Sequence, residues 1–335
     1  EQNLDPSIIG TMHALDLLRK AGDTFLIEDA LFNLAYLNIA KGDFAQARAN
    51  AEECLARARE REDVEGEGAY LRLLGNLDLI SGNLHQAVVT SREAQSCWDI
   101  SGNRSLSVGQ MDGQAGMAMS EGNYSQAIQL SEAVLAWCVK MNEKSMMLGA
   151  INSLGWEAWA LKDYDQAIRQ CEKSLTLARE LQPILGIKNM ELVAITSKYI
   201  LGRVALSQGE YVRAYAYLQE LLLSLEDKNE TFGILSLYGR SLFGLKGTAY
   251  LAINALGILA STQRQARRAA TLFGAQAELY EWQKYTLSLA EREEYERALA
   301  SARAALGDQA FTTAWEEGQR MTLDQAVAYA LGEYE

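Results

Sequence analysis

Four short segments of this chain decide its fold. They are Gly42-Asp43-Phe44-Ala45-Gln46-Ala47, Gly82-Asn83-Leu84-His85-Gln86-Ala87, Gly122-Asn123-Tyr124-Ser125-Gln126-Ala127 and Lys162-Asp163-Tyr164-Asp165-Gln166-Ala167. Each follows the one before at a step of 40 residues. A fixed period of this size is typical of a solenoid, in which each unit packs mainly on its neighbours and the array offers a long curved surface. The sequence therefore favours binding over catalysis.

Each period predicts a helix, a short turn and a second helix. A glycine suits the left-handed end of the first helix, and the Asp or Asn after it can cap the second. An alanine three residues after the aromatic or leucine faces the first helix. In most first helices a large residue precedes a small one that lets the partner helix approach; the pairs are Leu34-Ala35, Leu74-Gly75, Leu154-Gly155, Leu201-Gly202 and Leu256-Gly257.

Composition supports a folded, nearly all-helical chain. Only 2 of the 335 residues are proline, which breaks helix interiors. The net charge of −13 argues against binding to nucleic acid, whose backbone is also negative. We find no apolar run long enough for a membrane span and no signal peptide. The chain begins without methionine, which suggests a segment of a longer protein.

Cysteine and histidine usage argues against a metal site or a thiol nucleophile. Cys54, Cys97, Cys138 and Cys171 lie far apart, in the predicted second helices, and read as reduced core thiols of a cytoplasmic protein. The two histidines are His13 and His85. We expect no catalytic residues, no metal and no cofactor.

The repeated segments resemble the tetratricopeptide repeat, which has the same order of large residue, small residue, turn glycine, aromatic and alanine. A fifth copy, Gly209 to Ala214, follows after 47 residues, and a degenerate sixth runs from Leu256 to Ala269. The resemblance implies an all-α, right-handed α–α superhelix with a C-terminal helical cap. We expect an N-terminal capping helix at 1–23, about six repeats at 24–275 and the cap at 276–335.

The C-terminal stretch from Ala269 to Leu331 predicts three or four amphipathic helices. Gly307 and Gly318 read as helix stops and Thr322 as an N-cap. This tail also resembles the segment that closes the tetratricopeptide arrays of bacterial STAND-type ATPases, including LuxR-type transcription regulators. The resemblance implies the sensor part of such a protein, because the chain holds no phosphate-binding Gly-x-x-x-x-Gly-Lys motif.

In a superhelix of this kind the first helices line the concave face. Two positions in each first helix should point into that groove, and Trp159 lies one turn after one of them. The predicted ligand- or partner-binding residues are Phe32, Tyr36, Arg72, Asn76, Asp112, Asn152, Trp156, Trp159, Tyr199 and Arg203. Aromatic and arginine side chains suit a peptide, a partner helix or a sugar, and Arg72 and Arg203 are the expected anion contacts. The same side chains could instead pack between neighbouring repeats.

Three classes of function stay open. The first is a sensor in a bacterial signalling or transcription-regulatory protein, which binds a peptide, protein partner or small-molecule effector and biases a linked ATPase or output domain. The second is a passive protein–protein scaffold without a small-molecule ligand, and the third is an enzyme. The run Glu291, Glu293, Glu294 and Glu296 is expected to form a solvated helix face rather than a catalytic carboxylate pair.

Overall fold

The computed structural model describes residues 6–22, 24–185, 187–225, 244–277, 280–281 and 287–332. Within these ranges the regular secondary structure is helical throughout, as predicted. The chain divides into two compact units, Glu1–Gln110 and Met111–Glu335, each of which is described by itself.

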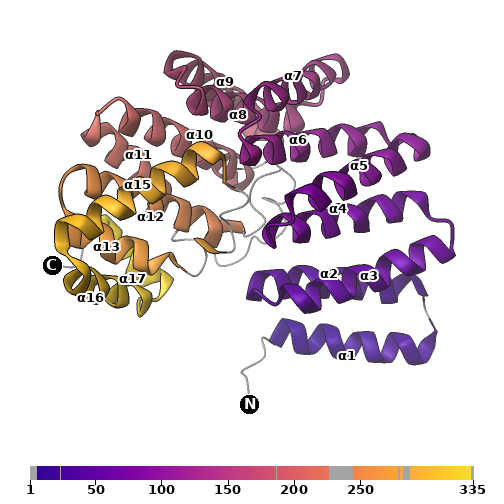
Figure 1. Cartoon of the computed structure of the whole chain (residues 1–335). Helices are drawn as coiled ribbons and strands as arrows, with labels where there is room; N and C mark the ends of the chain where they lie inside the picture. Colours follow the sequence, from indigo (N-terminus) through magenta and orange to yellow (C-terminus); the bar gives the residue numbers. More distant parts are fainter. Residues whose placement is uncertain are drawn as a thin grey trace. The chain divides into compact units, whose positions relative to one another are not determined.

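Unit 1 is a stack of helices that follow one another along the chain (Figure 1). They are α1 (Pro6–Ala21), α2 (Thr24–Lys41), α3 (Phe44–Glu60), α4 (Val64–Ile80) and α5 (Leu84–Ser101). Helix α6 (Arg104–Glu121) runs through the division between the units.

Unit 2 continues the helical pairs and ends in the cap. Its helices are α7 (Tyr124–Met141), α8 (Lys144–Ala160), α9 (Tyr164–Leu185), α10 (Ile187–Ser207), α11 (Tyr211–Leu223), α12 (Gly244–Thr262), α13 (Ala266–Ala275), α15 (Leu289–Leu306), α16 (Asp308–Gln319) and α17 (Leu323–Leu331). The repeats pair α2 with α3, α4 with α5, α8 with α9, α10 with α11, and α12 with α13. The fold is a tetratricopeptide-like helical solenoid with a C-terminal helical cap.

The turns have the backbone that the repeated segments predict. The left-handed turn glycines are Gly42, Gly82, Gly122 and Gly209, with φ of 78°, 79°, 79° and 78°. Lys162 takes the same left-handed conformation at φ 64° although it carries a side chain. After the turn, the side chains of Asp43 and Asp163 cap the next helix by accepting hydrogen bonds from backbone N–H groups, both at 3.0 Å. Asn83 makes no such bond, so the expected cap is missing there.

Small residues bring the two helices of a repeat together. The alanine after each turn has no exposed surface, as for Ala47, Ala87, Ala127, Ala167, Ala214 and Ala269. On the first helix, a Cβ added at Gly257 would lie 2.6 Å from the ring of Phe273. At Gly155 it would lie 3.5 Å from the Sγ of Cys171. Side chains from the second helix therefore occupy the space that these glycines leave.

The cap joins the last repeat through a close helix crossing. A Cβ at Gly274 of α13 would lie 2.1 Å from the carbonyl oxygen of Trp315, and one at Gly318 of α16 would lie 2.0 Å from that of Thr271. Helix α16 ends at Gln319, one residue after Gly318, so the helix stops close to where the sequence predicts, and Gly318 in its last turn also serves the crossing. Gly307 does end α15, with φ 75°.

Two further expectations concern the ends of elements. Thr322 is the N-cap of α17, and a capping box with Gln325 satisfies two backbone N–H groups. The sequence from about 231 to 260 is apolar without a clear break and predicts an additional helix before the sixth repeat; this segment falls partly outside the described residues, which resume at α12. No helix in the described part of the chain is long and apolar enough to cross a membrane.

Candidate interaction surface

The ten predicted binding residues divide between the two units. Phe32, Tyr36, Arg72 and Asn76 lie on α2 and α4 and form what we call the unit 1 stripe. The remaining six, Asp112, Asn152, Trp156, Trp159, Tyr199 and Arg203, lie on α6, α8 and α10 and form the unit 2 stripe. The two stripes differ in what already contacts them.

The unit 1 stripe begins with an aromatic cluster. The ring of Phe32 meets those of Tyr36 and Tyr70 edge to face, with centroids 5.0 Å and 5.5 Å apart. Tyr70, which lies outside the predicted set of binding residues, donates its hydroxyl hydrogen to the buried carboxylate of Glu28 at 3.2 Å. Arg61 pairs with the same carboxylate. Burial is the largest cause that raises the pKa of Tyr70, and charge interactions with Cys54 and Glu28 raise it further. The Tyr70 hydroxyl therefore stays protonated and remains a donor.

Arg72 rests against a buried indole. The side chain of Trp98 has no exposed surface and donates its Nε1–H to the backbone oxygen of Glu65 at 3.2 Å. A Cβ at Gly68 would lie 2.8 Å from that Nε1, so the glycine makes room for the indole against α4. The guanidinium of Arg72, one turn further on, lies 5.6 Å from the centroid of the Trp98 ring. This stacking leaves the guanidinium N–H groups available to other partners.

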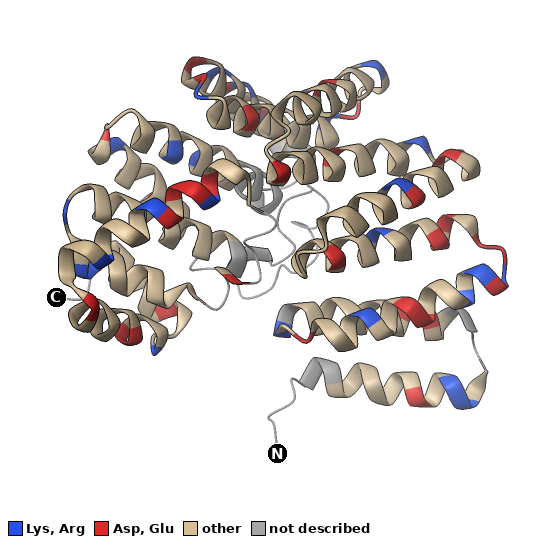
Figure 2. Cartoon of the chain, in the orientation of Figure 1, with Lys and Arg blue, Asp and Glu red and all other residues tan. Residues whose placement is uncertain are grey.

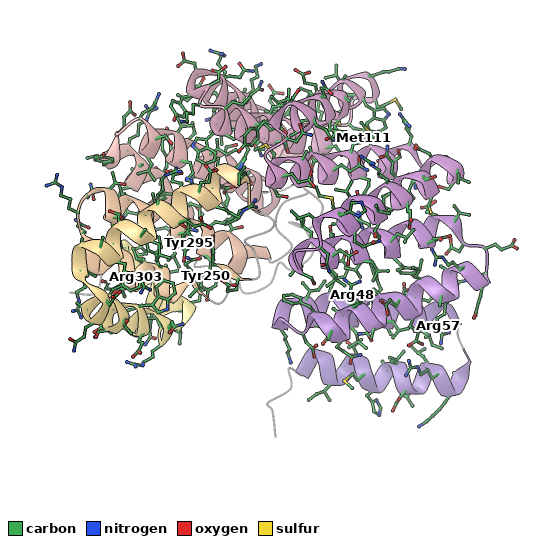
Figure 3. The ribbon with its side chains drawn as sticks, viewed as in Figure 1. Arg48, Arg57, Met111, Tyr250, Tyr295 and Arg303 are labelled. Atoms are coloured by element: carbon green, nitrogen blue, oxygen red, sulfur yellow. The ribbon has the colours of Figure 1, made fainter. Side chains whose placement is uncertain are left out.

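The polar members of the unit 1 stripe have unused hydrogen-bonding capacity. Arg72 and Asn76 are one turn apart on α4, and both are half-buried. Neither makes an ion pair or a side-chain hydrogen bond with any residue that the structure describes. By contrast, Arg48 (labelled in Figure 3) forms a salt bridge with Asp78 at 2.6 Å.

In the unit 2 stripe, polar side chains link neighbouring first helices. Asp112 accepts a hydrogen bond from the hydroxyl of Ser153 at 3.0 Å, which joins α6 to α8. Asn152 accepts one from Ser197 at 2.9 Å, which joins α8 to α10. These predicted ligand positions therefore also hold adjacent repeats together.

The aromatic part of the unit 2 stripe is buried. Trp156, Trp159, Tyr199 and Arg203 are 6%, 5%, 3% and 2% exposed. Trp156 stacks on Tyr199 with centroids 5.0 Å apart, and the guanidinium of Arg203 lies 4.5 Å from the centroid of Trp159. Arg203 also donates to the hydroxyl of Tyr199 at 2.7 Å.

Helix α15 contacts this aromatic group with two glutamates one turn apart. Trp156 donates its indole N–H to Glu291 at 3.2 Å. Arg203 forms an ion pair with Glu291 at 3.8 Å and donates a hydrogen bond to Glu294. Burial by itself would lower the pKa of Arg203, but Tyr199 and the two glutamates outweigh it and raise that pKa, so the guanidinium stays charged.

The first residues of α15 contact other repeats as well. The backbone N–H of Ala290 donates to the hydroxyl of Tyr124 at 3.2 Å, and Arg292 donates to the backbone oxygen of Ser120 at 2.5 Å. A Cβ at Gly122 would lie 2.8 Å from the side chain of Leu289. The start of α15 therefore spans α6 to α10, while Tyr295 (labelled in Figure 3) packs on Phe273 of α13 with ring centroids 5.1 Å apart.

The expectation of a solvated acidic face on α15 is wrong for two of its four glutamates. Acidic and basic residues are mixed along this helix (Figure 2). In a sequence, such a mixture of charges predicts a solvated helix face. The side chain of Glu291 is 3% exposed and that of Glu294 is 22% exposed. Glu293 and Glu296 are exposed, as expected. Glu291, which is buried, and Glu294, which is half-buried, lie inward because Trp156 and Arg203 supply donors that compensate the loss of water.

The four cysteines lie on second helices and are free thiols. Cys54, Cys138 and Cys171 are buried, and Cys97 is half-buried. Burial is the largest cause that raises the pKa of Cys54 and Cys171 to about 12 and that of Cys138 to about 11, so these thiols are poor nucleophiles. In the described residues no group of three or more His, Cys, Asp or Glu side chains could hold a metal ion.

Comparison with known proteins supports the repeat assignment. The family model for the tetratricopeptide repeat matches residues 28–61 and 148–181, which are the α2–α3 and α8–α9 pairs. The crystal structure of BtubC (BKLC) from P. vanneervenii superposes with a TM-score of 0.56 at 18% identity. That match covers 70% of this chain and 95% of the other. At this identity the likeness concerns the fold alone.

A second structure is a circular tandem repeat protein with novel repeat topology and enhanced subunit contact surfaces. The match covers 97% of this chain and 87% of the other chain at 14% identity, but its TM-score of 0.24 is too low to support an argument. Comparison with curated proteins gives no match. Tetratricopeptide repeats are present in this chain, and they suggest a protein-interaction module.

Proposed function

We propose that this chain is a non-catalytic interaction module and that a protein partner contacts the unit 1 stripe. The observation that carries the proposal is the contrast between the two stripes. In unit 2 the polar stripe residues all have partners within the chain, and α15 contacts Trp156 and Arg203. In unit 1, Arg72 and Asn76 have no hydrogen-bonding or ionic partner among the described residues.

The chemistry of the unit 1 stripe suits a protein surface. Aromatic and arginine side chains dominate the energetics of protein interfaces because they bury large areas and form planar hydrogen bonds. Phe32 and Tyr36 are held in place by the edge-to-face cluster, and Arg72 by the buried indole of Trp98. Side chains that are fixed before binding lose less conformational entropy when a partner arrives.

Comparative affinity capture tests this proposal. Wild-type chain, the double variant Tyr36→Ala/Arg72→Ala and the control Arg92→Ala would be used as bait, and the captured proteins would be quantified. Arg92 is an exposed arginine on α5, in the same repeat as Arg72 but on the second helix. We expect partners that wild type and the control both capture and the double variant loses. Identical captured sets for all three baits would contradict the proposal.

The wider role we propose is that of a sensor in a bacterial signalling or transcription-regulatory protein. Partner binding would change the curvature of the array and bias a linked ATPase or output domain between two states. The support is the resemblance of the C-terminal helices to the tails of STAND-type arrays. A full-length gene sequence without any nucleotide-binding or output module beside this segment would argue for the passive scaffold instead.

A further inference from the structure

Helix α15 shows which chemistry a stripe of this solenoid accepts. Its first turns present Glu291 and Glu294, three residues apart and therefore on one face of the helix. The donors that meet them are the indole of Trp156 on α8 and the guanidinium of Arg203 on α10. A helix with two carboxylates one turn apart is thus bound by donors from two neighbouring first helices.

The donors on α8 and α10 have counterparts in unit 1. Trp156 and Asn76 lie at equivalent positions, since both stand six residues before the turn residue, Lys162 or Gly82. Arg203 and Tyr36 stand at that same distance from Gly209 and Gly42. The same register position on neighbouring first helices therefore carries a donor in both units: an indole and a guanidinium in unit 2, a phenol and an amide in unit 1.

Arg72 adds a positive charge to the unit 1 set. It lies one turn before Asn76, and the nearest helix neighbours three and four residues away on either side carry no carboxylate. The polar groups that Tyr36, Asn76 and Arg72 offer to a carboxylate are a hydroxyl, an amide N–H₂ and a guanidinium. This set complements a carboxylate pair of the kind that α15 carries.

We propose that the unit 1 stripe binds an amphipathic helix with two glutamates one turn apart, the motif that α15 presents to the unit 2 stripe. Arg72 and Asn76 donate to one carboxylate and Tyr36 to the other, while the ring of Phe32 contacts the apolar side of the helix. This inference rests on the proposed function and specifies the partner for the same surface.

The α15 sequence itself provides the probe. A fluorescently labelled, end-capped peptide of residues 287–306 contains the capping box of Ser288 and Glu291, which favours helix formation. Its binding to the full chain would be followed by fluorescence anisotropy at fixed ionic strength. We expect saturable binding, and an affinity about ten-fold lower for the Arg72→Gln chain because a charge-assisted hydrogen bond is lost. The Arg92→Gln chain should bind like wild type.

A second peptide with Glu291→Gln and Glu294→Gln tests the carboxylates separately. It should bind the wild-type chain at least about ten-fold more weakly than the parent peptide. Equal affinity of the two peptides, no binding of the parent, or binding that Arg72→Gln leaves unchanged would each overturn the inference. Loss of partner capture in the double variant, together with failure of the peptide to bind, would leave the proposed function standing and remove only the helix as its ligand.

Discussion

Replacing Arg203 with methionine should release the start of α15 from the solenoid. The side chains of Arg203 and Glu291 are each 3% exposed, so the change leaves a buried carboxylate without its cation. Removing one partner of a buried ion pair costs about 3–5 kcal/mol. Glu294 is 22% exposed and can regain water, so most of the cost comes from Glu291 and we expect about 3 kcal/mol.

A compensating variant separates the charge effect from lost packing. Arg203→Met with Glu291→Gln and Glu294→Gln removes the cation and both carboxylates while keeping side-chain size. It should recover part of the lost stability and lie within about 2 kcal/mol of wild type, because buried ion pairs can be replaced at little net cost. The stability that this triple variant does not recover includes the contact of the Arg203 guanidinium with Trp159, worth about 0.5–2 kcal/mol.

Urea unfolding followed by tryptophan fluorescence measures both variants. Trp156 and Trp159 lie within the contact and are 6% and 5% exposed, so they report its opening. If Arg203→Met stays within about 1 kcal/mol of wild type, or the triple variant is no more stable than Arg203→Met, α15 is not seated on the first helices through this ion pair.

Three further predictions test the packing, the turns and the thiols. Gly274→Ala should cost about 3 kcal/mol because its Cβ would meet a backbone oxygen at 2.1 Å. The matched change Gly116→Ala in α6, where a Cβ meets no described atom within 4 Å, should stabilise by about 1 kcal/mol in thermal unfolding. Lys162→Gly should raise the urea midpoint by relieving a left-handed residue at φ 64°, a gain of about 1 kcal/mol. Because burial raises the pKa of Cys54 and Cys171 to about 12, the folded state favours the protonated thiols, and their contribution should be lost as the pH rises from about 9 towards 12. Urea midpoints at pH 8 and 10.5 should therefore differ less in a Cys54→Ala/Cys171→Ala variant.

The repeat unit could be predicted from the sequence because its determinants are local. A turn residue with positive φ, a capping side chain and a small residue facing an alanine all act within about one helical pair. Gly42 and Gly82 predict the left-handed turn conformation directly, because glycine adopts positive φ readily. Even where Lys162 replaces the glycine, the neighbouring Asp163, Tyr164 and Ala167 keep the turn in phase, and Asp163 still caps the helix.

The packing of α15 against Trp156 and Arg203 could not be predicted, because it joins residues that lie far apart in the chain. Glu291 and Trp156 are separated by 135 positions, and no local pattern relates them. The mixed charges around Glu291 also resemble the solvated face of any surface helix. A one-dimensional pattern identifies which side of a helix is polar, but it does not identify which distant donor compensates a glutamate that becomes buried.

One signal in the sequence did point to this contact. Arg203 stands alone in the apolar run from Tyr199 to Leu206, at a position where the neighbouring repeats carry uncharged residues. A charge on the buried side of a helix requires a partner, since burying it unpaired costs several kcal/mol. Arg72 on α4 is likewise a charge among apolar neighbours, and no carboxylate of the described residues pairs with it. Arg203 is neutralised within the fold in unit 2. We propose that Arg72 in unit 1 is neutralised by a partner instead, so that one array would use its first helices for structure in one place and for recognition in another.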